Sequence, residues 1–133
     1  KTDYALLILT ALSREPRRFF SLSGLAGAYR MPRRSIEHVV RPLVAEGILE
    51  SREGVRGGYR LARSPGKITV KEIVAAEEGG VALAACLDAS KGFACALKST
   101  CTARRGIPRV QQLVLAALAD HTLADLVNEN TQS

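Results

Sequence analysis

The stretch from Pro32 to Glu46 constrains the fold of this chain more than any other, because its side chains divide into two stripes at helical spacing. Proline is tolerated in the first turn of a helix, and Gly47 is a typical residue just past a helix end. The stretch therefore predicts an amphipathic helix with one face on a core and one in solvent. The inner stripe is Ile36, Val39, Val40, Leu43 and Val44, and the outer stripe is Arg34, Glu37, His38 and Arg41.

Two shorter helices are expected before this one. Residues 3–12 carry apolar side chains at helical spacing, and Asp3 can cap the free amides at their start. Ser21 is expected to cap a second short helix that turns Leu25 inward. The side chains expected to face inward from the first helix are Tyr4, Leu7, Ile8, Ala11 and Leu12.

Two strands and three further helical segments are expected after it. Ile48–Ser51 pairs naturally with Tyr59–Ala62 across a glycine-rich segment, which predicts a two-stranded wing. Thr69 and Glu72 have capping-box spacing and predict a helix that ends before residue 80. Residues 107–119 predict a strongly apolar helix that needs a partner, and Thr122 begins a short last one. The fold class is therefore mostly α with a small β wing, a winged helix-turn-helix followed by a long helix.

Positive charge is concentrated in the first half of the chain. Residues 1–67 hold 13 Lys and Arg against 6 Asp and Glu, whereas residues 68–133 hold 6 against 7. A helix-turn-helix with a basic face and a glycine-rich arginine wing is typical of binding to double-stranded DNA, through major-groove contacts from the helix and minor-groove or backbone contacts from the wing. The candidate DNA-binding residues are Arg33, Arg34, Ser35, Glu37, His38, Arg52, Arg56, Gly57, Gly58 and Tyr59.

The sequence gives little support for an enzyme, a membrane protein or a secreted protein. The sequence offers no grouping of nucleophile and base, no phosphate loop and no paired carboxylates, so an enzyme is not expected. The longest apolar runs are far shorter than the roughly 20 residues that cross a bilayer, and no secretory signal is visible. A cytoplasmic location without membrane association is expected.

All three cysteines, Cys86, Cys95 and Cys101, lie in residues 81–106, a stretch without sustained periodicity that is expected to be a loop. Eight and then five residues separate them. An odd count does not suit a closed disulfide set, and a structural zinc site would show paired close spacings. Three thiolates on a loop can hold an iron–sulfur cluster, or they can be buried or redox-reactive thiols.

Several segments together resemble the winged-helix regulator family that includes IscR, NsrR and RirA. The most specific is Arg56-Gly57-Gly58-Tyr59-Arg60-Leu61-Ala62, and the likeness continues through Ile68-Thr69-Val70, the cysteine loop and Thr122-Leu123-Ala124-Asp125-Leu126. The resemblance implies a homodimer that crosses its long helices and reads a palindromic operator, with 1–80 as the DNA-binding domain, 81–106 as the cluster-binding loop and 107–133 as the dimerisation segment.

The resemblance also implies a cofactor, a 2Fe-2S or 4Fe-4S cluster held by Cys86, Cys95 and Cys101. Asp3 resembles the N-terminal aspartate that NsrR-like members supply across the dimer, while the histidine that IscR-like members use is replaced by Arg104. The eight-residue gap resembles RirA-like and cluster-assembly regulators. The resemblance thus implies a repressor that senses iron, cluster status, nitric oxide or redox state. A regulator of this kind without a cluster would instead control DNA binding through thiol oxidation or a protein effector. A protein that only carries a cluster, without regulating transcription, would have no use for the basic wing.

Overall fold

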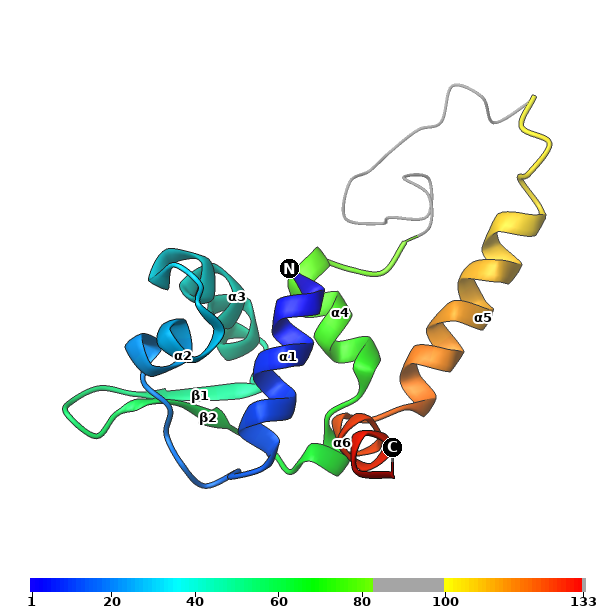
Figure 1. Cartoon of the computed structure of the whole chain (residues 1–133). Coiled ribbons are helices and arrows are strands. Elements are labelled where there is room, and N and C mark those ends of the chain that lie inside the picture. Colours follow the sequence, from blue (N-terminus) through cyan, green and yellow to red (C-terminus); the bar gives the residue numbers. More distant parts are fainter. Residues whose placement is uncertain (83–99, 133) are drawn as a thin grey trace.

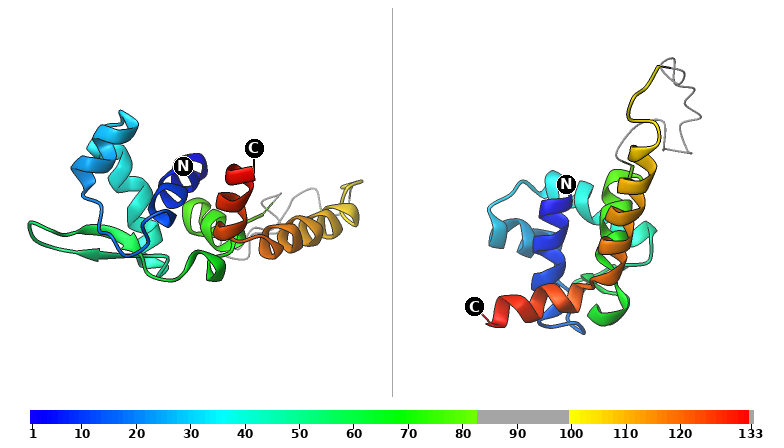
Figure 2. Two further views of the ribbon diagram at one scale, coloured as in Figure 1. Left: turned by 60° about the horizontal axis from the view of Figure 1, so that its bottom comes forward. Right: turned by 90° about the vertical axis from the view of Figure 1, so that its right-hand side faces the viewer.

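The computed structural model describes residues 1–82 and 100–132 of the 133-residue chain. Helices and a small hairpin make up this part of the molecule, and the wing and α5 lie at its opposite ends (Figures 1 and 2). The fold class predicted from the sequence is confirmed. The elements are α1 (Thr2–Ser13), α2 (Leu22–Tyr29), α3 (Arg33–Ala45), β1 (Leu49–Arg52), β2 (Gly58–Leu61), a 3-10 turn η1 (Pro65–Lys67), α4 (Val70–Glu78), α5 (Gly106–Asp120) and α6 (Leu123–Gln132).

Helix α3 forms where it was predicted, with its apolar stripe inside. Its buried side chains are Ile36, Val39, Val40 and Leu43. These pack with the buried residues of α1, the wing and α4 into one core, and Val44 packs against its edge. The other face of α3 therefore turns toward solvent, as the two-stripe pattern requires.

Helix α1 also forms as predicted, and Ile8 and Leu12 of its expected inner face are buried, but Tyr4 and Leu7 were wrongly included in that face. The buried residues are Ala5, Ile8, Leu9 and Leu12, whereas Tyr4 and Leu7 are 44% and 45% exposed. The helix is apolar on most of its circumference, so two overlapping stripes satisfied the helical spacing. Packing against α3, α4 and α6 selects between the two stripes, and a local pattern does not contain that information.

The predicted cap at the start of α1 is also wrong. The helix begins at Thr2, which places Asp3 inside its first turn, and no side chain caps it. By contrast, Ser21 caps α2 by accepting a hydrogen bond from the Gly24 amide at 2.9 Å. The Thr69–Glu72 capping box at the start of α4 is formed as predicted.

Backbone hydrogen bonds join the start of α6 to the start of α4. The Val70 amide donates to the His121 carbonyl at 2.9 Å, and the Leu123 amide donates to the Ile68 carbonyl at 2.8 Å. Thr122 and Asp125 exchange hydrogen bonds at the start of α6 as Thr69 and Glu72 do at the start of α4. Helix α6 extends to Gln132.

Helix α5 projects from this body and keeps much of its apolar surface in solvent (Figure 2). Val110 and Leu113, on the predicted apolar face, are 49% and 62% exposed. Gln111 is instead the buried residue, and its side-chain amide donates to the Val81 carbonyl next to the end of α4. Within one chain, therefore, a polar contact fastens α5, while the described residues leave Val110 and Leu113 largely uncovered.

One carboxylate is buried within this fold. Glu77 of α4 is 5% exposed, and within the described part of the chain neither of its oxygens has a hydrogen-bond partner. Burial raises the pKa of Glu77 to about 7, against the opposing charge of Lys1. The ionised form is therefore disfavoured in the folded state.

This burial predicts a pH-dependent stability. Between pH 4.5 and 7 the unfolded chain releases a proton that the folded chain keeps, so the free energy of unfolding falls as the pH rises through this window. We expect Glu77→Gln to be more stable than the wild type by on the order of 2–3 kcal/mol at pH 8, and the two to converge below pH 4. Urea unfolding at both pH values measures this difference. The exposed Glu46→Gln is the control, and a pH-independent difference for Glu77→Gln would contradict the assignment.

Candidate nucleic-acid interface

The outer face of α3 presents the residues that the sequence singled out. Arg33, Arg34 and His38 are exposed, and Ser35 and Glu37 are half-buried. Glu37 accepts a hydrogen bond from Arg41, one turn further along the helix, at 3.1 Å. Both partners of that pair remain accessible, and the arginines near the start of the helix project from the helix-turn-helix into solvent.

The wing lies next to this helix-turn-helix (Figure 1). Its strands pair in antiparallel register with Glu50 opposite Arg60 and Arg52 opposite Gly58. Arg52 and Arg56 are exposed, as the prediction of a DNA-contacting wing requires. Tyr59 is half-buried and packs against the core, so the structure places it in the base of the wing.

A third segment, from the loop before α2, pairs with the wing. The Phe20 amide donates to the Tyr59 carbonyl and the Tyr59 amide donates to the Phe20 carbonyl, both at 2.8 Å. This bridge connects the wing to the start of α2. It was not predicted, because nothing local in the sequence indicates which distant backbone would pair with β2.

The fold of the protein itself requires glycine at positions 57 and 58 of the wing. A Cβ on Gly58, where φ is +136°, would lie 2.2 Å from the Phe20 carbonyl oxygen. A Cβ on Gly57 would lie 2.0 Å from the Arg52 carbonyl oxygen. Both positions therefore require glycine for close approach within the wing, independently of the predicted approach to DNA.

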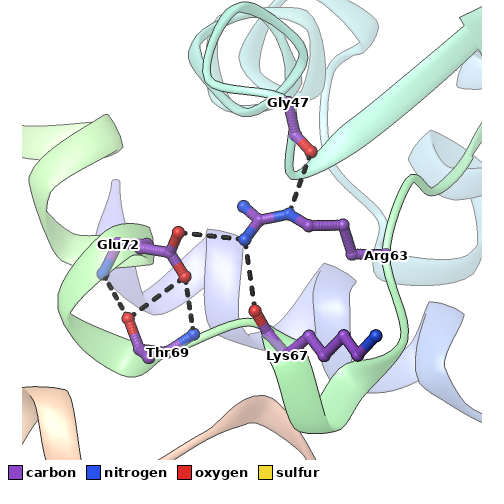
Figure 3. Close-up of polar contacts among 5 residues, drawn as sticks. All are labelled: Gly47, Arg63, Lys67, Thr69 and Glu72. Carbon is purple, nitrogen blue, oxygen red and sulfur yellow. Dashed lines mark hydrogen bonds and ion pairs between the residues drawn. The ribbon is translucent and has the colours of Figure 1, made fainter.

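Arg63 links the wing to α4 (Figure 3). Its guanidinium donates to the Gly47 carbonyl at 3.3 Å, to the Lys67 carbonyl at 3.1 Å and to the Glu72 carboxylate at 3.0 Å. Burial alone would raise the pKa of Glu72, but the Thr69 amide and the Arg63 guanidinium outweigh it and hold the pKa below its ordinary value. One side chain thus connects the end of α3, the η1 turn and the capping box of α4. Sequence reasoning missed Arg63, because no local pattern indicates that groups 4, 9 and 16 residues away meet at one side chain.

The predicted cluster ligands are only partly described. Cys86 and Cys95 lie outside the described residues, while Cys101 is a half-buried free thiol. Asp3 is exposed at the start of α1, which lies beside the end of α4, because the Thr2 hydroxyl donates to Glu78 at 2.8 Å. Residues 100–105 extend beyond α5, well away from the N-terminus (Figure 1). Among residues 1–82 and 100–132, no three His, Cys, Asp or Glu side chains gather closely enough to hold a metal ion.

No helix in the described residues has both the length and the apolar character that crossing a bilayer requires.

Comparison with known proteins agrees with this architecture. A family model described as Rrf2, an iron-dependent transcriptional regulator, matches residues 1–129. The HTH-type transcriptional regulator NsrR of Geobacillus kaustophilus is 30% identical over 131 residues, which cover 96% of this chain and 87% of that protein. NsrR of Bacillus subtilis is 30% identical over 127 residues, covering 95% and 86%. These relatives are named as regulators and not as enzymes.

Solved structures share the fold. CymR, described as the global cysteine regulator of B. subtilis, superposes with a TM-score of 0.73 at 26% identity, covering 96% of this chain and 93% of that chain. IscR of T. potens superposes with a TM-score of 0.68 at 22% identity, covering 97% and 84%. The IscR likeness concerns the fold alone.

The close approach at Gly58 yields a prediction. We expect Gly58→Ala to destabilise the protein by about 2 kcal/mol or more, because alanine must adopt a positive φ and its Cβ meets the backbone of Phe20. Thermal or urea unfolding measures the loss. Gly27→Ala in α2 is the matched control, since its Cβ would meet nothing within 4 Å and the change favours helix. Equal stability of Gly58→Ala and the wild type would refute this account of the wing.

Proposed function

Because this chain belongs to the Rrf2 family of transcriptional regulators, we propose that it binds a palindromic double-stranded DNA operator as a homodimer and represses transcription under the control of an iron–sulfur cluster. The single observation that carries the DNA-binding part is the side-by-side placement of two exposed basic elements, the outer face of α3 and the arginine wing. Residues 1–80 would form the DNA-binding domain, 81–106 the cluster-binding loop and 107–133 the dimerisation segment.

In the proposed complex, the start of α3 enters the major groove. Arg33 and Arg34 bind phosphates or guanine, and Ser35, Glu37 and His38 offer hydrogen bonds to base edges. To accept a hydrogen bond from a base, Glu37 must first release Arg41. This is possible because both side chains are accessible to solvent. Arg52 and Arg56 reach the adjacent minor groove or backbone from the wing.

The apolar face of α5 supports the homodimer. Exposed apolar side chains on a projecting helix lose contact with water when a second copy covers them. Two-fold symmetry would then place the two α3 helices for two half-sites, roughly one helical turn of DNA apart.

The donor set supports a cluster. Thiolates are the ligands that iron–sulfur clusters prefer, and the described Cys101 is free and only half-buried. We propose that Cys86, Cys95 and Cys101 hold a 2Fe-2S or 4Fe-4S cluster, with Asp3 of the partner subunit as the fourth ligand. Residues 100–105 lie well away from the N-terminus within one chain (Figure 1), so a ligand set that joins Cys101 to an N-terminal carboxylate would use the carboxylate of a second copy. When bound, the cluster would supply sensitivity to iron supply, cluster status, nitric oxide or oxidants.

The chain's own residues offer a route from the loop to the DNA-binding face. Val81, the first residue of the proposed 81–106 loop, accepts a hydrogen bond from Gln111 of α5. Helix α4 leads from there back to Glu72, and Glu72 pairs with Arg63 beside the end of α3. A change at the loop that moves α4 would therefore also move the end of α3, because these polar contacts connect the two helices.

The cluster is tested on protein purified without oxygen. We expect visible absorption bands with matching iron and sulfide, and loss of most of the iron in Cys101→Ser. Asp3→Ala is expected to lower the iron content or change the spectrum, while Asp120→Ala, an exposed carboxylate on α5, is the control. A colourless, iron-free protein whose DNA binding responds to thiol oxidation or to a protein effector would replace the cluster with that alternative.

The homodimer is tested by placing a charge on the exposed face of α5. We expect Leu113→Glu to convert the dimer into a monomer and to lower operator affinity by more than tenfold, because each copy would bury an unpaired carboxylate at the contact. Light scattering after gel filtration measures the mass. Gln112→Glu adds the same charge at the adjacent exposed position and is expected to stay dimeric. A monomeric wild type, or a dimeric Leu113→Glu, would contradict the proposal.

A further inference from the structure

The ring of Phe19 lies against two arginines of the wing. The guanidinium carbon of Arg60 is 4.4 Å from the ring centroid, and that of Arg52 is 5.8 Å from it. Both distances fall within the range in which a cation is attracted to an aromatic face. Phe19 is half-buried and comes directly before the residue that pairs with the wing, so the Phe20–Tyr59 bridge fixes its place.

Arg60 already has partners that hold it against the ring. Its guanidinium pairs with Glu50, the residue opposite it in the wing, and donates to the Arg17 carbonyl at 3.2 Å. Arg60 is therefore neutralised by a carboxylate, and its side chain keeps one orientation. Phe19 is placed in turn by the backbone pairing of its neighbour Phe20 and by its contact with this guanidinium.

Arg52 differs from Arg60 in having no carboxylate partner among the described residues. Gly58, the residue opposite Arg52, has no side chain that could hold Arg52 in place. The Phe19 ring is thus the contact that orients Arg52, whose flexible side chain otherwise samples many rotamers.

A hollow of about 400 Å³ lies beside Arg52, between the wing and the starts of α2 and α3. Within the described part of the chain, neither Arg33 nor Arg52 forms an ion pair, and both line this hollow with the hydroxyls of Ser23 and Ser51. One carboxylate, Glu53, also lines it, which leaves a net positive charge. Two guanidiniums with neighbouring hydroxyls are suited to the oxygens of a phosphate.

We propose that Phe19 is a positioning residue for DNA binding, which holds Arg52 over this hollow so that Arg52 and Arg33 bind one phosphate of the DNA backbone there. The inference rests on the proposed DNA-binding function. Its physical basis is preorganisation, because an arginine already restricted by the ring loses less conformational freedom when the phosphate arrives. Phe19 itself does not touch the DNA.

A double-mutant cycle tests the proposal on full-length protein with a duplex selected from a random-sequence pool. We expect Phe19→Leu to weaken binding about two- to fivefold, as loss of a cation–π contact implies. Arg52→Ala is expected to weaken binding further. It should also reduce the slope of log affinity against log salt concentration by the amount that corresponds to about one phosphate contact. In the Arg52→Ala background, Phe19→Leu should have no additional effect. Phe19→Tyr keeps an aromatic face and should restore wild-type affinity.

A second duplex of unrelated sequence provides an independent readout. Phosphate contacts carry no sequence information, so Phe19→Leu should weaken binding to both duplexes by the same factor. Equal losses from Phe19→Leu with and without Arg52, or no loss in the wild-type background, would overturn the positioning role while the proposed function stands. A wild-type protein that binds neither duplex would instead overturn the proposed function.

Discussion

Burial of one stripe of α3 is the constraint on which the rest of this structure depends. Ile36, Val39, Val40 and Leu43 are all buried, and α3 contacts α1, α2, α4 and β1. Removing these side chains from water stabilises the fold and at the same time decides which residues remain outside. Because the outer stripe carries Arg34 and His38, the packing that forms the core also forms the candidate DNA-binding face.

Two long-range polar connections place the neighbouring elements relative to α3. The backbone pairing of Phe20 with Tyr59 joins the wing to the start of α2, and only glycine at position 58 allows that approach. Arg63 joins the end of α3 to the start of α4, from which the chain continues toward the segment that carries the cysteines. The first connection sets the geometry of the DNA-binding surface, and the second links that surface to the segment proposed to sense a signal.

The sequence predicted those features that local patterns determine. The strong amphipathic period of α3, the glycine-rich hairpin and the Thr69–Glu72 box each contain their own signal, and all three are formed. The inner face of α1 was only partly right, with Ile8 and Leu12 buried but Tyr4 and Leu7 exposed, because in an almost uniformly apolar helix the packing partners select the buried face. Arg63 and Phe19 escaped notice because no local pattern indicates their partners, which lie 4, 9 and 16 residues from Arg63 and more than 30 residues from Phe19. The cluster ligands rest on resemblance, since Cys86 and Cys95 lie outside the described residues.

The central claim is that paired α3 helices and wings read a symmetric DNA site, and footprinting of the operator tests it most directly. A duplex selected by the purified protein should show a protected palindrome, with two major-groove segments roughly one helical turn apart. Arg34→Ala, which removes an exposed guanidinium from α3, should remove the protection at both segments. Absence of any protected palindrome, in protein with and without bound iron, would contradict the account.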